Sequence, residues 1–229
     1  MNVVAARVPL RRSVVHPRSA CMSCSTELAW YDNVPVLSYL VLRGRCRSCG
    51  VRISPLYPAV EVATAALVAA CFVAFGLSGK AVVAAFFCAV LVAITATDIT
   101  HRIVPNRIVL PAALLVLLAQ TALEPSPEWA LGAFGAAGFL FVAALAYPGG
   151  MGMGDVKLAL LLGAMLGRNV TVGLMVGMIA GLVPSLVLVV RHGAAARKMG
   201  IPFAPFLALG AVVALFAGDA LLDAYLSTF

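Results

Sequence analysis

The chain has 229 residues, of which 63% are hydrophobic and 11% are charged, and its mean hydropathy is +1.06. Soluble domains average roughly 45–50% apolar and 25% charged residues, so a soluble globule of this size is excluded. The chain is also too apolar to be disordered, and six cysteines are too few for a disulfide-stapled miniprotein. We therefore expect an integral membrane protein.

The net charge of +7 is concentrated at the amino-terminal end. Residues 1–57 carry eight arginines against Glu27 and Asp32, for a net charge of +6. No apolar run in this part approaches the roughly 20 residues that span a bilayer. The sequence therefore predicts a basic polar module, 1–57, followed by a transmembrane domain, 58–229. A basic charge placed ahead of such an apolar body does not indicate nucleic-acid binding.

Seven apolar stretches follow the module and predict about seven transmembrane helices, so the expected fold is an all-α polytopic membrane protein. The stretches are 58–78, 81–97, 108–123, 130–147, 156–167, 169–190 and 203–226. The fifth stretch is short for a bilayer, and we expect it to be tilted or locally exposed to water.

The orientation follows from the lysines and arginines of the short loops. The loops 98–107 and 191–198 are basic, whereas 124–129 carries two glutamates and no base. An alternating path with the module in the cytoplasm places both basic loops inside and the acidic loop outside. Lys80 and Arg168 are exceptions, because this path puts both outside.

Four of the six cysteines form two CxxC pairs in the module. The pairs are Cys21-Met-Ser-Cys24 and Cys46-Arg-Ser-Cys49. Two such pairs match the tetrahedral geometry of a structural zinc site, and zinc would supply folding energy that a module with few large apolar side chains lacks. The alternatives are two disulfides or four free thiols, and a cytoplasmic location disfavours disulfides. Cys71 and Cys88 lie inside spans, where we expect small buried hydrophobes.

Two of the seven acids beyond residue 57 stand out as functional candidates, because an ionisable group at a membrane span is costly. Asp98 ends the second span, and Asp155 follows the glycine-rich stretch 149–154. The orientation places both at the cytoplasmic face. Two carboxylates that share a proton are what an aspartic protease needs. The alternative is that each aspartate is a helix cap, which leaves the glycines unexplained, and the residues alone leave the two interpretations evenly matched.

Asp219 and Asp223 lie four positions apart near the end of the last span. Because no cationic residue accompanies them in the sequence, we interpret them as an interfacial helix end rather than a site.

Several ordered motifs resemble the type IV prepilin peptidases, also called leader peptidase/N-methyltransferases. The string Gly152-Met-Gly154-Asp155 fits the GxGD pattern of intramembrane aspartyl proteases, and Asp98 and the CxxC pairs accompany it. Further matching stretches are Asn33-Val-Pro-Val-Leu-Ser-Tyr, Arg43-Gly-Arg-Cys46-Arg-Ser-Cys49, Tyr57-Pro-Ala-Val-Glu61, Gly154-Asp155-Val-Lys157-Leu and Ile201-Pro-Phe-Ala-Pro-Phe.

The resemblance implies a peptidase that removes the short basic leader of prepilins and pseudopilins at the inner face of the bacterial cytoplasmic membrane. The two catalytic aspartates of the family match Asp98 and Asp155, and Gly152 and Gly154 belong to the supporting active-site loop. Many members also methylate the new amino terminus with S-adenosylmethionine, an activity associated with the cysteine module. The residues that contact this cofactor stay unassigned.

The sequence departs from the family pattern at two places. The family usually has one more span before the module, so we expect that span to be missing here. Ala204 stands where the family commonly has glycine. Glu61 matches a family position near the start of a span, where it is either a helix-dipole partner or a second-tier active-site residue, and we favour the first.

Two functions from other classes compete with the peptidase. One is a non-catalytic zinc-dependent membrane assembly protein of a pilus or secretion system. The other is a transporter, which predicts carboxylates near mid-span, whereas Asp98 and Asp155 lie at span ends. As a further partner we expect anionic membrane lipid, because it attracts both a basic leader and the basic module.

Overall fold

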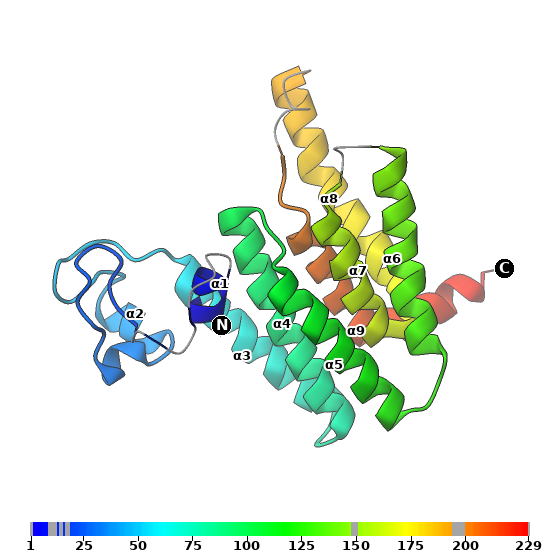
Figure 1. The fold of residues 1–229 in the computed structure, drawn as a ribbon, viewed down its shortest axis with the longest axis horizontal. Helices are drawn as coiled ribbons and strands as arrows, with labels where there is room; N and C mark the ends of the chain where they lie inside the picture. Colours follow the sequence, from blue (N-terminus) through cyan, green and yellow to red (C-terminus); the bar gives the residue numbers. More distant parts are fainter. Residues whose placement is uncertain are drawn as a thin grey trace.

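The computed structural model describes residues 2–8, 13, 16, 19–147, 151–193 and 200–228. Figure 1 shows a small lobe around α2 attached to a larger bundle of helices. In the part of the chain described, the regular elements are helices, joined by turns and by two isolated β-bridges. The predicted all-α class is confirmed. The predictions that fall on Gly149, Gly150, Arg197 and Lys198 lie outside the described residues.

The elements follow the chain in two groups. The small lobe and its connection to the bundle contain α1 (Asn2–Arg7), the 3₁₀ helix η1 (Trp30–Asn33) and α2 (Leu37–Val41). The bundle contains α3 (Leu56–Phe75), α4 (Gly79–His101), α5 (Asn106–Leu123), α6 (Glu128–Ala146), α7 (Met153–Leu166), η2 (Gly167–Asn169), α8 (Val170–His192) and α9 (Ala204–Leu226).

Six segments of the described residues are long and apolar enough to cross a membrane. Five are α3, α4, α5, α6 and α9, and the sixth, Met153–His192, contains both α7 and α8 with η2 between them. Each of the seven predicted apolar stretches therefore corresponds to one helix from α3 to α9. The protein is a multi-pass membrane protein.

Successive bundle helices alternate in direction, so one end of the bundle gathers the starts of α5, α7 and α9 and the end of α4 (Figure 1). Two contacts at this end show the arrangement. Lys157 Nζ of α7 donates to Asn106 Oδ1 of α5 at 2.9 Å, and the backbone N–H of Ala204 in α9 donates to Asp98 Oδ2 of α4 at 3.1 Å. Both candidate aspartates therefore lie at this end.

The opposite end of the bundle holds ion pairs that the sequence did not reveal. Lys80 Nζ lies 3.0 Å from Glu124 Oε2, and an Arg168 Nη lies 3.1 Å from Asp219 Oδ1. The expectation that no cation accompanies Asp219 was wrong, because its partner is 51 residues away in the chain. Lys80 and Arg168, the two exceptions to the predicted orientation, are thus each paired with an acid.

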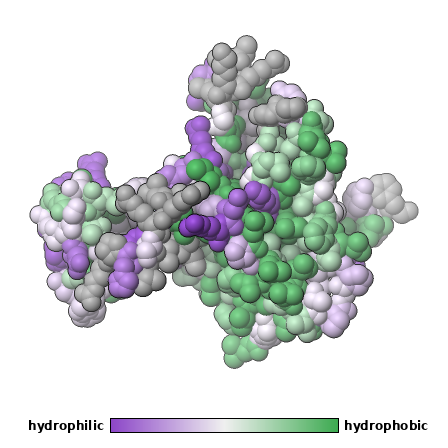
Figure 2. Space-filling view, viewed as in Figure 1, coloured by the Kyte–Doolittle hydropathy of each residue, from purple (hydrophilic) through white to green (hydrophobic). Residues whose placement is uncertain are grey.

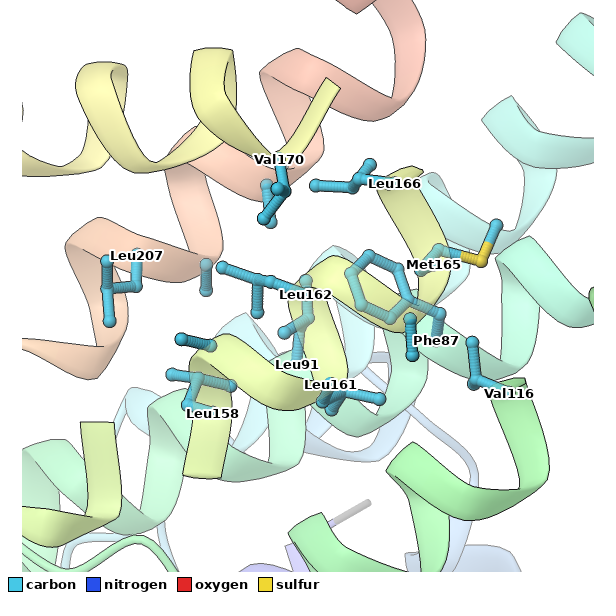
Figure 3. Packing of buried hydrophobic residues seen from close by; sticks show 14 of the residues in the cluster. Phe87, Leu91, Val116, Leu158, Leu161, Leu162, Met165, Leu166, Val170 and Leu207 are labelled. Carbon is cyan, nitrogen blue, oxygen red and sulfur yellow. The ribbon is translucent and has the colours of Figure 1, made fainter. Parts of the chain in front are cut away.

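Helix α7 lies in the middle of the bundle, and nine of its 14 residues are buried (Figure 3). Leu158, Leu161 and Leu162 are all fully buried. The side chains packed around them come from four other helices and include Phe87, Leu91, Val116, Val170 and Leu207. Burial of this apolar face fixes α7, and with it the residues at its first turn.

Glycines bring two helix pairs into backbone contact. A side chain at Gly163 of α7 would overlap the carbonyl oxygen of Gly132 in α6, and one at Gly210 of α9 would overlap that of Gly173 in α8. In a membrane, where lipid competes for apolar surface, such close backbone packing is a main source of helix association. The glycines therefore fix α7 against α6 and α9 against α8.

Glu61 joins the module to the bundle. Its Oε2 accepts the backbone N–H of Val36 at 2.9 Å, and its Oε1 accepts an N–H of the Asn2 side-chain amide at 3.0 Å. Val36 has a φ of 60°, which is unusual for a β-branched residue. Glu61 lies beyond the first turn of α3, so the helix-dipole interpretation was wrong. The carboxylate instead links α1, α3 and the turn before α2.

Candidate active site and metal centre

Asp98 lies in the last turn of α4 and is 6% exposed. Its Oδ2 accepts the backbone N–H of Ala204, the first residue of α9. The first N–H groups of a helix have no partner within the helix, so this contact satisfies one of them and holds the carboxylate in place. The cap interpretation is thus correct in part for Asp98, although the helix it caps is α9 and not its own.

Asp155 is the third residue of α7 and is half-buried. The N-cap of α7 is Gly152, and no side chain caps this helix. The carboxylate turns back toward Gly152, whose backbone N–H interacts with it, as the third-position acid does in a capping box. A side chain on Gly152 would lie 3.6 Å from Asp155 Oδ2, which shows how closely the loop follows the carboxylate.

The structure brings Asp98 and Asp155 close enough for their charges to interact, although 57 positions separate them. Gly154 contributes to this approach. A Cβ at Gly154 would lie 2.9 Å from Cβ of Val104, in the segment that follows α4. Because a real Cβ hardly ever comes this close, any side chain at Gly154 would displace the start of α7.

The two carboxylates have different surroundings. Arg102 follows α4 in a left-handed conformation, and its charge acts on Asp98, which also accepts the Ala204 N–H. The charge that acts on Asp155 is that of Asp98. A backbone N–H reaches each carboxylate, that of Ala204 for Asp98 and that of Gly152 for Asp155, so the difference between the two is the positive charge of Arg102, which favours negative charge on Asp98.

The four module cysteines lie together with their sulfur atoms within 4.8 Å of one another. Sγ of Cys21 is 3.8 Å from Sγ of Cys49. Two sulfurs bound to one tetrahedral zinc at about 2.3 Å lie ~3.8 Å apart, so the observed spacing suits this metal. All four cysteines are free thiols, which argues against the alternative of two disulfides.

The two CxxC turns share one backbone pattern. In the first, the N–H of Ser25 donates to the carbonyl of Cys21, and in the second, the N–H of Gly50 donates to that of Cys46. Ser25 and Gly50 each follow the second cysteine of their pair, and both have positive φ, 55° and 68°. A β-bridge flanks each turn. The sequence thus folds each pair into the same small loop that presents two sulfurs.

The thiols of the cluster ionise unequally. The hydroxyl of Thr26 lowers the pKa of Cys24 to about 6, and the backbone N–H groups of Cys49 and Ser48 lower the pKa of Cys46. Although the backbone N–H of Val51 favours the Cys49 thiolate, partial desolvation and the neighbouring sulfurs raise its pKa to about 12. Zinc binds thiolates, so the lowered pKa values of Cys24 and Cys46 fit a metal-binding cluster.

Sequence reasoning missed three residues beside the aspartates. They are Arg102, Val104 and the backbone N–H of Ala204. The motif around Ala204 had matched the family pattern, but nothing in the sequence linked it to Asp98, which lies 106 positions earlier. Cys71 and Cys88 lie fully buried in the apolar core, as predicted.

The chain is thus a helical multi-pass membrane protein with two neighbouring carboxylates at one end of its bundle and a four-cysteine module beside that end. Two family profiles match it: "Bacterial Peptidase A24 N-terminal domain" over residues 1–75 and "Type IV leader peptidase family" over residues 85–190. The protein belongs to the type IV leader peptidase family.

Among curated relatives, three proteins named prepilin leader peptidase/N-methyltransferase illustrate the similarity. The Bacillus subtilis protein is 37% identical over 96% of this chain and 90% of its own length. The Myxococcus xanthus protein is 40% identical over 76% of this chain and 54% of its own length, and the Pseudomonas aeruginosa protein is 35% identical over 93% and 76%. No solved structure matches the chain.

Proposed function

We propose that the protein is a prepilin peptidase that cleaves the basic leader from type IV prepilins and pseudopilins by aspartic hydrolysis. The observation that carries this proposal is the approach of Asp98 and Asp155 from the end of α4 and the start of α7. The family membership and the names of the relatives support it. The substrate class comes from those names.

Hydrolysis would use the different surroundings of the two carboxylates. Ionised Asp98 takes a proton from a water molecule, whose oxygen attacks the scissile carbonyl carbon. Protonated Asp155 donates its proton to the carbonyl oxygen, which gives a neutral tetrahedral intermediate. Collapse of the intermediate breaks the C–N bond while Asp98 returns a proton to the leaving nitrogen and Asp155 recovers its own. Gly154 supports this step by keeping the start of α7 close to Val104 in the segment after α4, and Gly152 forms the loop beside the Asp155 carboxylate.

We assign the active-site end of the bundle to the cytoplasmic face of the bacterial inner membrane. The module, with its net charge of +6, is attached at this end through α1 and the start of α3. Basic segments near a span favour the cytoplasmic side. The division into a module, 1–57, and a peptidase domain, 58–229, belongs to the same proposal.

We also propose that Cys21, Cys24, Cys46 and Cys49 bind one structural zinc ion. The support is the 4.8 Å cluster of four free thiols and the lowered pKa values of Cys24 and Cys46, since zinc binds thiolates. Zinc would crosslink two turns that otherwise share little apolar contact.

A second activity, methylation of the new amino terminus with S-adenosylmethionine, is proposed from the names of the relatives. The residues around the open pocket of the module fit this cofactor poorly, because three arginines line it and would repel a sulfonium cation. We therefore assign no residue to the methyl donor.

The test is co-expression of the full chain with a prepilin and measurement of leader loss on a gel. Asp98→Asn and Asp155→Asn should each lower cleavage by about 10²–10⁴-fold, the range for general acid–base groups. Their abundance in the membrane and their zinc content should match those of the wild type. The competing function, a non-catalytic assembly protein, predicts that neither substitution changes leader loss, because no leader would be lost at all.

A further inference from the structure

An open pocket of about 540 Å³ lies where the module meets the first bundle helix, and its lining includes neither candidate aspartate. The module occupies the lobe at the left of Figure 2, where hydrophilic residues are frequent, whereas the bundle surface is mainly hydrophobic. The lining residues are Tyr39, Arg43, Gly44, Arg45, Arg52, Ile53, Ser54 and Pro55. Three of these eight are arginines, and none is acidic.

The positive charge of this pocket has no internal counter-charge. Arg45 and Arg52 face each other across an isolated antiparallel β-bridge, and like charges placed directly opposite destabilise such a pair. All acidic residues of the chain lie in its described parts, and none pairs with Arg43, Arg45 or Arg52. By contrast, Arg47 lies 2.7 Å from Asp32. The module therefore neutralises one arginine and leaves three around the pocket unpaired.

The backbone around the pocket is fixed before any ligand binds. The N–H of Gly44 donates to the carbonyl of Tyr39, and the carbonyl of Gly44 accepts the N–H of Ile53, both at 2.8 Å. Gly44 has a φ of +67°, and a Cβ there would lie 2.9 Å from the ring of Tyr39. The glycine is therefore needed both for the turn and for the aromatic packing. A rigid frame of this kind holds the arginines on one side without a ligand.

The pocket adjoins the start of α3, where the lipid headgroups begin when α3 spans the hydrocarbon core. Ser54 and Pro55 directly precede α3, whose 20 residues are about 30 Å long, the thickness of the hydrocarbon core. Next to the pocket, Leu40 and Val41 at the end of α2 are 65% and 68% exposed. Exposed apolar side chains beside cationic ones are typical of a surface that lies on a membrane.

We propose that this pocket binds the phosphate group of an anionic phospholipid headgroup. A planar guanidinium group can bind two phosphate oxygens with two parallel hydrogen bonds. The β-bridge holds Arg45 and Arg52 side by side, so both could bind the same phosphate. The neighbouring Leu40 and Val41 favour a lipid over free phosphate as the source of the anion. The inference goes beyond the proposed function and does not depend on peptide cleavage.

The test is native mass spectrometry of the full chain purified in detergent. Phosphatidylglycerol and phosphatidylcholine with the same acyl chains are added in equal amounts, and the retained lipids are counted. The wild type should retain phosphatidylglycerol in preference. Arg45→Gln/Arg52→Gln removes the charge-assisted hydrogen bonds to the phosphate oxygens, so it should weaken retention by more than about tenfold. The matched control Arg107→Gln/Arg191→Gln removes the same charge from exposed arginines elsewhere and should retain phosphatidylglycerol as the wild type does.

Two results would overturn the proposal: no preference for phosphatidylglycerol in the wild type, or an equal loss in both double variants, which would indicate general charge attraction. Should the zinc content of the glutamine variant fall, Arg45→Lys/Arg52→Lys replaces it. This variant keeps the charge and loses the planar fork, so retention should fall severalfold, and unchanged retention would refute the bidentate site. Excess inorganic phosphate identifies the source: displacement of the lipid supports recognition of the phosphate group alone, and persistence supports the headgroup with its chains.

Discussion

The module and the membrane bundle are held together in opposite ways. Among the residues 19–55 whose burial the structure describes, only Gly44 and Cys46 are buried. The bundle, by contrast, buries a continuous cluster centred on α7, and glycine contacts tighten it further. The module therefore has turns, β-bridges and the proposed zinc ion to stabilise it, whereas the bundle is stabilised by its buried apolar cluster. This difference predicts that damage to one region leaves the other folded. It also predicts that the module is most sensitive to loss of the metal, and the bundle to changes in close helix packing.

The largest expected effect is loss of the metal. Cys46→Ser, or treatment with a chelator, should unfold the module, because structural zinc contributes about 10–16 kcal/mol in small metal domains. Limited proteolysis should then cut within residues 19–55 while α3–α9 stay protected. Leader cleavage should fall far less than in Asp98→Asn.

If Cys46→Ser abolished cleavage as completely as Asp98→Asn while the protein stayed in the membrane, the two regions would not be independent. Ser48→Ala serves as the matched control, since it lies in the same turn and supplies no sulfur.

A smaller effect is expected at the start of α7. Gly154→Ala would place a Cβ 2.9 Å from that of Val104, and overpacking of this kind costs about 1–3 kcal/mol. The displacement falls directly beside Asp155, so leader cleavage should drop at least about tenfold. Gly135→Ala is the control, because nothing lies within 4 Å of a Cβ there. Equal rates for the two variants would remove Gly154 from the supporting loop.

A still smaller effect is expected from loss of the contact between the two regions. Glu61→Ala leaves the N–H of Val36 and the amide of Asn2 without their acceptor, at a cost of about 1–3 kcal/mol. Hydrogen exchange should speed up around residues 34–41 and stay unchanged in α7. Glu27→Ala, which removes an exposed carboxylate of the module, is the control. Unchanged exchange in Glu61→Ala would show that Glu61 does not hold the module.

The smallest effect is expected at Ala204. Its backbone N–H donates to Asp98, and Ala204→Gly keeps this donor while restoring the residue common in the family. Cleavage should stay within about twofold of the wild type, since a glycine near a helix start costs only a few tenths of a kcal/mol. A tenfold change in the measured rate would mean that the buried methyl group itself matters.

The sequence predicted the bundle well because its signals are local. Each of α3–α9 is an apolar stretch that reads as a span by composition, and the CxxC spacing alone predicted the sulfur cluster. Three features could not be read in this way: the pairing of Arg168 with Asp219, the role of Glu61 and the contact of Ala204 with Asp98. Each of these contacts joins residues at least 25 positions apart in the chain. Whether such residues meet depends on how the segments are arranged in space, which local sequence patterns do not reveal.

The short length of α7 has a consequence for the access of water. Its 14 residues cover about 21 Å, some 9 Å less than a typical hydrocarbon core. Because other helices surround α7, lipid cannot make up the missing length by thinning along its sides. We therefore expect the first turn of α7, which carries Asp155, to lie below the headgroup layer in a space that water can enter from the membrane face. Water for hydrolysis would then reach Asp155 through this space, and only the residues flanking the scissile bond would have to leave the helical conformation to enter it.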